Sequence, residues 1–187
     1  MNNIKREERR LYKKAAAFIL LLLIAWSIPH SSNGQNIAKH YTSSMEDNGT
    51  IYYIRPQSGF KRAAKGSLDY DITYITGNDS ATFDFSFYNK SLLTTIDSIV
   101  VIADGNRYTS RTTKLFVESK KHKWHYRYAA TFSFADLKKI FEAKQPPLLT
   151  IHSQSQSFSM KQSQKKWSKN SGITSKIFNL IMLNKSK

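Results

Sequence analysis

Hydrophobic and polar positions alternate most regularly in two segments near the middle of the chain. In Leu68–Ile75 and Ala81–Tyr88, aromatic or aliphatic side chains occupy every second position, and Asp, Thr or Ser side chains lie between them. A period of two predicts strands with one buried and one wet face. The connector Gly77-Asn78-Asp79-Ser80 supplies turn residues. The two segments therefore predict a β-hairpin with an aromatic face and a face that carries carboxylates.

Further strand candidates lie on both sides of this hairpin. Five further segments have strand-like patterns: Thr50–Arg55, Ile96–Ala103, Thr112–Glu118, Lys123–Phe132 and the short segment Leu148–His152. Pro56 is expected to stop the first of them, because proline cannot donate to a strand ladder. Residues 57–66 are then expected to form a basic loop, and residues 153–169 a loop or an exposed edge. Residues 119–122 predict a tight basic turn.

Two helices complete the pattern. Ser133 and Asp136 have the spacing of a capping box, and apolar residues follow at helical intervals until Pro146-Pro147. Near the end of the chain, Ile173, Ile177 and Ile181 form one apolar stripe. That stripe is expected to cover the open face of the sheet; the alternative is a docking surface for a partner or a membrane. The predicted fold is mainly β, a sandwich-like antiparallel sheet domain over residues 50–187 with one or two covering helices.

The beginning of the chain has the pattern of a secretory signal peptide. Six basic residues precede an uncharged run over residues 15–28, and small residues Ser32 and Gly34 stand before a possible cut at Gln35. The run is shorter than the roughly 20 apolar residues that span a bilayer. Residues 1–34 are therefore predicted to be a cleaved signal peptide, with an uncleaved signal anchor as the alternative. Residues 35–49 are expected to be a flexible lead-in.

This pattern predicts an exported protein, located in the periplasm or at the cell surface or anchored to the inner membrane. The chain has a formal charge of +16; residues 1–34 hold six basic and two acidic side chains, so their removal leaves +12. Such an excess favours polyanionic partners such as acidic glycan, lipopolysaccharide, anionic lipid or extracellular nucleic acid. The alternative is a solvated surface without a partner. No intracellular nucleic acid is expected, and the absence of cysteine excludes disulfides and thiolate metal sites.

The most suggestive acidic group is Asp69, Asp71 and Asp84 on the polar face of the central hairpin. Paired carboxylates separated by about 7 Å are compatible with acid–base chemistry or with calcium binding. In a basic protein, however, carboxylates on a strand usually pair with Lys or Arg of a neighbouring strand. Lys123 and Arg127 are the expected partners, so the acidic face is predicted to be structural.

No motif specifies catalysis or a cofactor. His122 and His125 point to opposite faces if their segment is a strand, which argues against a metal site. The sequence contains neither a Gly-x-Ser-x-Gly elbow nor a His-Glu-x-x-His pair. A triad of distant residues remains compatible with the sequence. No cofactor and no catalytic residue is predicted.

Two lysine groups are candidate contacts for a polyanion. The first is Lys120, Lys121 and Lys123; the second is Lys165, Lys166 and Lys169. The first group adjoins several aromatic residues, which resembles a stacking platform for nucleic acid. Strand alternation places these aromatic residues on the face opposite Lys123 and Arg127, so a half-buried strand is the preferred interpretation.

Three segments resemble exported proteins of unknown activity from Bacteroides and its relatives: Ile51–Phe60 (IYYIRPQSGF), Leu68–Tyr74 (LDYDITY) and Lys165–Lys169 (KKWSK). The resemblance covers about residues 50–184 and implies no catalytic residue or ligand. Within it, Ser80 and Ser98 lie in Asp-Ser-apolar triplets similar to the O-glycosylation acceptors of that group. A turn and a strand entry are the alternative interpretations of these triplets.

The sequence therefore predicts a non-catalytic exported cell-envelope protein that acts as a binding or assembly module. Its expected partner is an envelope protein or an anionic glycan or lipid. A hydrolase acting on envelope or host polymers, and a protein that binds polyanions, are the alternatives.

Overall fold

The fold follows from the alternation of aromatic and polar side chains, which places one face of every central strand toward a shared core. The computed structural model describes residues 37–61, 66–154 and 156–185. These residues belong to the unit Asn36–Lys187. The predicted signal peptide, residues 1–34, lies outside the described residues.

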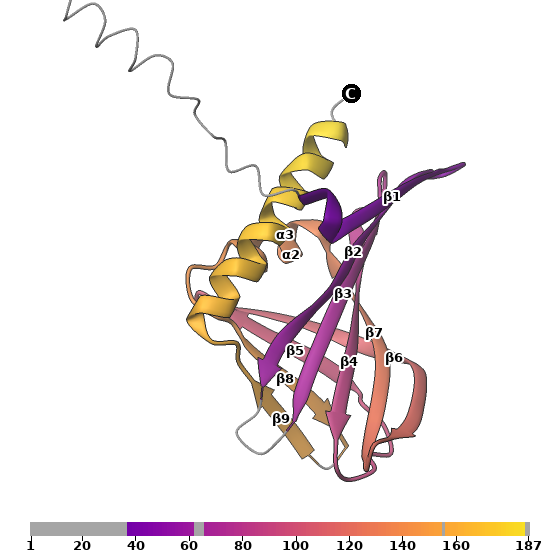
Figure 1. Cartoon of the computed structure of the whole chain (residues 1–187), viewed down its shortest axis with the longest axis vertical. Helices are drawn as coiled ribbons and strands as arrows, with labels where there is room; N and C mark the ends of the chain where they lie inside the picture. Colours follow the sequence, from indigo (N-terminus) through magenta and orange to yellow (C-terminus); the bar gives the residue numbers. More distant parts are fainter. Residues whose placement is uncertain (1–36, 62–65, 155, 186–187) are drawn as a thin grey trace, which may run out of the picture. The chain divides into compact units, whose positions relative to one another are not determined.

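Nine strands and three helical segments make up the described chain (Figure 1). In chain order they are η1 (Ile37–His40), β1 (Tyr41–Glu46), β2 (Gly49–Lys61), β3 (Ser67–Ile75), β4 (Ser80–Asn89), β5 (Ser98–Ala103), β6 (Asn106–Lys120), β7 (Lys123–Ser133), α2 (Phe134–Glu142), β8 (Leu148–Ser153), β9 (Gln156–Met160) and α3 (Gln164–Lys185). The prediction of a mainly β domain with covering helices is confirmed.

All nine described strands form one antiparallel sheet in the order β1-β2-β3-β4-β7-β6-β5-β8-β9. The sheet divides at β6, which pairs with β5 over Asn106–Arg111 and with β7 over Thr112–Lys120. Because its two parts leave β6 in different directions, β5, β8 and β9 pass behind β2, β3 and β4 (Figure 1). The rings of Phe87 on β4 and Phe158 on β9 lie 5.2 Å apart. The sheet thus packs against itself in a sandwich-like manner.

The core is aromatic, and the two α-helices close one end of it. Tyr70 of β3 stacks on Phe83 of β4 at 5.1 Å and also contacts Phe141 of α2 at 5.7 Å. On α3, Trp167 stacks on Phe141 at 5.6 Å, and Phe178 contacts Phe134 at 5.0 Å. The predicted stripe of the terminal helix, Ile173, Ile177 and Ile181, is buried in the same hydrophobic core as the inner side chains of the sheet. No helix of the described ranges has the length and the apolar content needed to span a bilayer.

Several boundaries differ from those expected. Ile37–Glu46, expected within a flexible lead-in, forms η1 and β1, because every residue of β1 pairs with β2. The strand β2 continues past Pro56, since register shifts around this position absorb the missing donor. Residues 156–160 form the edge strand β9, and α3 begins at Gln164, well before its predicted stripe. The described part of the expected basic loop is largely strand.

Candidate functional site

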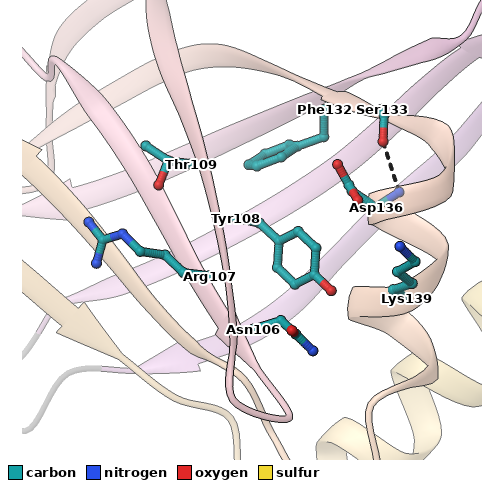
Figure 2. Close-up of a pocket in the computed structure, with 8 residues that line it drawn as sticks. All are labelled: Asn106, Arg107, Tyr108, Thr109, Phe132, Ser133, Asp136 and Lys139. Atoms are coloured by element: carbon teal, nitrogen blue, oxygen red, sulfur yellow. Dashed lines mark hydrogen bonds between the residues drawn. The ribbon is translucent and has the colours of Figure 1, made fainter.

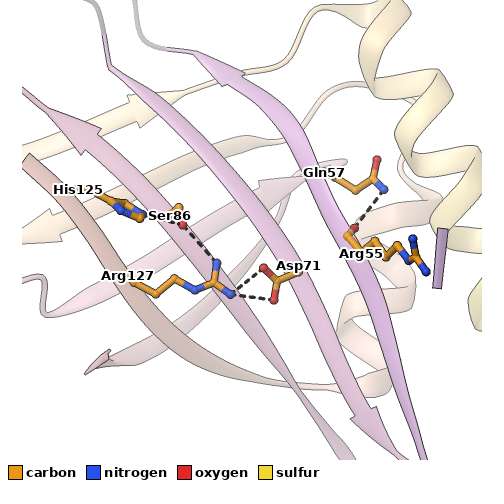
Figure 3. Close-up of polar contacts among 6 residues, drawn as sticks. All are labelled: Arg55, Gln57, Asp71, Ser86, His125 and Arg127. Carbon is orange, nitrogen blue, oxygen red and sulfur yellow. Dashed lines mark hydrogen bonds and ion pairs between the residues drawn. The ribbon is translucent and has the colours of Figure 1, made fainter. Parts of the chain in front are cut away.

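The three predicted carboxylates, Asp69, Asp71 and Asp84, lie on the outer face of the sheet, where the guanidinium of Arg127 contacts Asp71 (Figure 3). Asp71 on β3 is directly opposite Asp84 on β4, and Asp69 is opposite Ser86. Arg127 of β7 donates from Nη2 to both carboxylate oxygens of Asp71, at 2.7 and 2.9 Å. The Asp71 side chain is only 2% exposed. The predicted pairing of this acidic face with Arg127 is thus confirmed for Asp71, whereas Lys123 forms no ion pair with any carboxylate of the described residues.

Burial raises the pKa of all three carboxyl groups. For Asp71 the hydrogen bonds and the charge of Arg127 oppose this increase. The pKa of Asp84 is raised by burial and then by the Asp71 charge, again against Arg127. The pKa of Asp69 is raised by burial, against the positive charge of Lys166 and that of His125 when its imidazole is protonated. Asp71 and Asp84 are therefore both influenced by Arg127, whereas Asp69 is influenced by Lys166 and His125.

A second polar chain begins at the same guanidinium (Figure 3). Arg127 Nη1 donates to Ser86 Oγ at 3.3 Å. His125 Nε2 lies 3.0 Å from Ser86 Oγ, and His125 Nδ1 lies 2.9 Å from Glu118 Oε1. The order is therefore acid, imidazole, hydroxyl, guanidinium and buried acid, from Glu118 to Asp71. A nucleophilic serine needs a base and an orienting acid in this connectivity.

Aromatic rings hold the imidazole of His125 in place. Tyr88 stacks on it at 4.6 Å with an interplanar angle of 11°, and Phe116 meets it edge-on at 5.1 Å. The His125 side chain is 8% exposed, whereas Glu118 is 51% exposed and Ser86 is half-buried. The imidazole is thus fixed by packing, and the serine and the acid retain contact with solvent.

Sequence reasoning did not single out Ser86 or Glu118. A two-residue turn at Lys121-His122 places Glu118 opposite His125, and this turn is the signal that would have indicated the pair. The contact with Ser86 depends on the pairing of β4 with β7. These strands are not consecutive in the chain, so no local pattern specifies it.

The first predicted lysine group lines a hollow at the end of the same face. The hollow measures about 300 Å³ and is lined by Ser67, Tyr88, Lys120, Lys121 and Lys123; we call it the lysine hollow. No acidic side chain of the described ranges forms an ion pair with these three lysines. Tyr88 belongs both to this hollow and to the stack on His125. The hollow and the Ser86–His125 pair are therefore neighbours.

The second predicted lysine group lies on α3 and does not form one cluster. Lys165 and Lys169 are exposed. Lys169 acts on His40, whose pKa is lowered by burial and then by the charges of Lys39, Lys169 and Arg55. Lys166 is half-buried, and its charge opposes the increase in the pKa of Asp69 instead. Trp167 between them is buried and donates from Nε1 to the Ala143 carbonyl, which leaves no ring face for a ligand.

A larger hollow of about 510 Å³ lies between β6 and α2 (Figure 2). The ring of Tyr108 occupies its centre, with Asp136 and Lys139 of α2 beside it (Figure 2). Burial raises the pKa of Tyr108, and the charges of Asp136 and Asp104 add to this increase. The phenol therefore stays neutral and offers a hydrogen-bond donor and an acceptor. Its mixture of charges makes this hollow suited to polar rather than purely anionic ligands.

The two O-glycosylation candidates lie in different environments. Ser80 is exposed at the first position of β4. Ser98 is half-buried at the start of β5, where it lines a hollow of about 550 Å³ together with Arg111, Lys114 and Tyr128. Both triplets remain predictions, and the exposed Ser80 is the more accessible acceptor.

His125 lies on the outer face of β7, as the strand pattern predicted. His122 lies in the turn that precedes the strand, so the two histidines do not occupy opposite faces of one strand. Within the described ranges no group of three or more His, Asp or Glu side chains is arranged to hold a metal ion. Comparison with models of protein families, with curated proteins and with solved structures finds no match.

Proposed function

We propose that this protein is an exported cell-envelope module that binds an anionic polymer, an acidic glycan above all, at the lysine hollow. The convergence of Lys120, Lys121 and Lys123 on one hollow, without an acidic partner in the described ranges, is the observation that carries this proposal. Ammonium groups that lack internal partners interact favourably with fixed negative charges at short range.

Two further observations support this choice. Asp71 is paired with Arg127, and Asp69 and Asp84 are half-buried, so these three carboxylates compete only weakly with an incoming anion for the lysines. Asp69 and Glu118 lie near Tyr88, where burial and then these two charges raise the tyrosine pKa. Their presence limits the affinity for a single anion and favours a polymer that contacts several lysines at once.

Retention of the full chain on heparin–agarose tests the proposal. The variant K120Q/K121N/K123Q removes the three charges of the hollow and places Asn at Lys121, where φ is positive. The matched control K165Q/K169Q/K176Q removes the same charge from exposed lysines of α3. We expect the hollow variant to bind at least about tenfold more weakly, with a salt slope reduced by roughly two to three. Equal losses of retention in both variants would show that binding depends on the total charge of the protein and not on the lysine hollow.

Export is tested separately by fractionating native cells. We expect the chain in the periplasmic or envelope fraction, with its amino terminus at or near Gln35 after cleavage. A soluble cytosolic chain that retains Met1 contradicts export.

A further inference from the structure

We propose that Ser86, His125 and Glu118 form an esterolytic centre on the outer face of the sheet. The two key contacts are 3.0 Å from Ser86 Oγ to His125 Nε2 and 2.9 Å from His125 Nδ1 to Glu118 Oε1. The proposed substrate is a carboxylic ester carried by the anionic polymer. The choice of polymer rests on the proposed function; the chemistry does not.

Glu118 and Arg127, at the two ends of this series of hydrogen bonds, determine which atoms of His125 and Ser86 carry protons. A carboxylate only accepts hydrogen bonds, so Glu118 requires the proton of the neutral imidazole on Nδ1. Nε2 is then left as the acceptor. Arg127 donates to Ser86 Oγ at 3.3 Å, which leaves the serine proton free for His125. Both ends therefore favour the tautomer in which His125 acts as the base toward Ser86.

Neighbouring contacts fix the two side chains on which the chemistry depends. His125 is held between Tyr88 and the edge of Phe116, so its ring has little rotational freedom. Arg127 is held by two hydrogen bonds to the buried Asp71. Its guanidinium is thus a fixed positive group beside the hydroxyl, in a position to stabilise negative charge that develops on an acyl oxygen.

The reaction balances with water as the only co-reactant. Ser86 Oγ bonds to the acyl carbon while its proton passes to His125 Nε2. The ester C–O bond then breaks, and His125 returns the proton to the leaving alkoxide oxygen. A water molecule attacks the acyl-serine by the same route in reverse, which releases the carboxylic acid and restores the hydroxyl. Glu118 and Asp71 are positioning residues, because they act through His125 and Arg127.

The location of the centre connects it with the lysine hollow. Tyr88 lines that hollow with one part of its surface and stacks on His125 with another. A polymer that lies across Lys120, Lys121 and Lys123 would thus pass beside Ser86. An O-acylated acidic polysaccharide combines the two required groups, the negative charges and the ester.

Two measurements on the full chain test the chemistry without the polymer. A fluorophosphonate probe is expected to label the wild-type chain at Ser86, as located by peptide mass spectrometry. For p-nitrophenyl acetate, we expect kcat/KM to fall by at least about 100-fold in S86A and H125Q. T82A is the matched control, since Thr82 lies on the same face of the same strand. The proposal is overturned if the probe does not label the wild-type chain or labels S86A equally well, and the rates of S86A and H125Q lie within about twofold of the wild-type rate.

Variants of Glu118 and Ser86 separate catalysis from folding. Glu118 is half-exposed, and E118Q is expected to reduce kcat by about tenfold at constant KM, whereas E118D recovers part of the rate. S86C keeps a nucleophile beside His125, and its alkylation by iodoacetamide is expected to slow at least about tenfold when H125Q is added. Equal alkylation rates with and without His125 also overturn the proposal.

An acetylated pectin distinguishes this inference from the proposed function. The hollow variant K120Q/K121N/K123Q is expected to release acetate from this polymer more slowly than the matched control K165Q/K169Q/K176Q does. Retention on heparin with no Ser86 labelling disproves the esterolytic centre alone. Labelling without retention disproves the lysine hollow alone.

Discussion

At the scale of single residues, the outer face of the sheet is organised by Arg127. This guanidinium joins the buried Asp71 to Ser86 and lies close to a second carboxylate, Asp84. Removal of one partner from such a buried ion pair is costly, because the remaining charge stays in a poorly solvated place. The carboxylate of Asp84, unlike that of Asp71, has no comparable ion pair with Arg127. Asp84 is therefore the least favourable charge of this group.

Replacement of Asp84 by Asn is expected to stabilise the protein at neutral pH. The pKa of Asp84 is raised above 3.8 by burial and then by the facing Asp71. The folded state therefore holds this proton more tightly than the unfolded chain, and stability decreases as pH rises through this range. We expect D84N to gain about 0.5–1 kcal/mol at pH 7, since facing like charges cost this much. Urea unfolding measures the difference.

The pH dependence distinguishes this effect from a change in packing. Well below pH 3.8 the carboxyl group of Asp84 is neutral, like the Asn side chain that replaces it. The stabilisation by D84N should therefore vanish there. D47N, in the exposed turn after β1, is the matched control and should show no such trend. A gain that persists at low pH would assign the effect to packing.

The sequence indicated part of this polar face. Alternation placed Asp71 and Arg127 on the wet faces of their strands, and opposite charge made them candidate partners. The connection of Ser86 to His125 required knowledge that β4 pairs with β7 across an intervening segment. Such non-local pairing is set by packing of the whole sheet, and periodicity contains no information on it.

At the scale of elements, two tight turns differ in how well their residues suit their backbone. Asp104-Gly105 and Lys121-His122 both have positive φ at the two central positions, as in a type I′ turn. Asp-Gly suits this conformation, whereas Lys and His carry side chains that disfavour it. The hairpin of β6 and β7 therefore contains backbone strain next to the lysine hollow.

Exchange of the strained turn for Asn-Gly is expected to stabilise the domain. The variant K121N/H122G reduces the steric cost of two left-handed residues, which is about 1–2 kcal/mol for each residue. G105A in the other turn provides the opposite test, with an expected loss of about 1 kcal/mol, because φ is +81° there and no neighbouring atom blocks the added methyl group. Thermal unfolding measures both. Equal melting temperatures in all three proteins would argue against the assigned turn type.

Docking of α3 depends on one buried side chain. Trp167 is 1% exposed, stacks on Phe141 and donates to the Ala143 carbonyl at 2.9 Å. We expect W167A to lose about 3–5 kcal/mol through the cavity it leaves. W167F keeps most of the ring and loses the hydrogen bond, with an expected cost of about 1–2 kcal/mol. If urea unfolding gave equal losses for both variants, the ring would contribute nothing beyond its indole N–H.

Local pattern predicted some elements well and others poorly. The hairpin of β3 and β4 was clear because each strand has one wet and one dry face. β1 was missed because it is an edge strand in which five of six residues are exposed. The start of α3 was missed because Lys165, Lys166 and Ser168 dilute its apolar stripe. Pro56 does not end β2, since a strand accommodates proline where its register shifts.

At the scale of the whole molecule, the sheet is held in its curved form by contacts between its distant parts. Lys61 and Lys161 exchange backbone hydrogen bonds at 3.0 and 3.2 Å, which joins the end of β2 to the residue after β9. The aromatic core fills the space between the two parts of the sheet, and α3 covers one end. Apolar packing thus sets the fold, whereas the charges on its surface oppose it.

Salt is expected to stabilise this protein. The chain has a formal charge of +16, and the ion pairs among the described residues include Arg127–Asp71, Lys138–Glu142 and, through a histidine, His125–Glu118. Repulsion among the remaining positive charges destabilises the compact state. At 0.1 M salt the screening length is about 10 Å, so a rise from low salt to a few tenths molar NaCl removes most of this repulsion.

We expect the melting temperature to rise by about 3 °C over that range, which for a domain of this size corresponds to roughly 1 kcal/mol. The variant K165Q/K169Q/K176Q removes three exposed positive charges from α3, so its melting temperature should be higher at low salt and respond less to NaCl. Chloride is the appropriate anion here, because sulfate or phosphate would stabilise most proteins through exclusion from their surfaces. A melting temperature that is constant or falls with NaCl would mean that the ion pairs and the helix ends, which salt weakens, outweigh the repulsion among lysines.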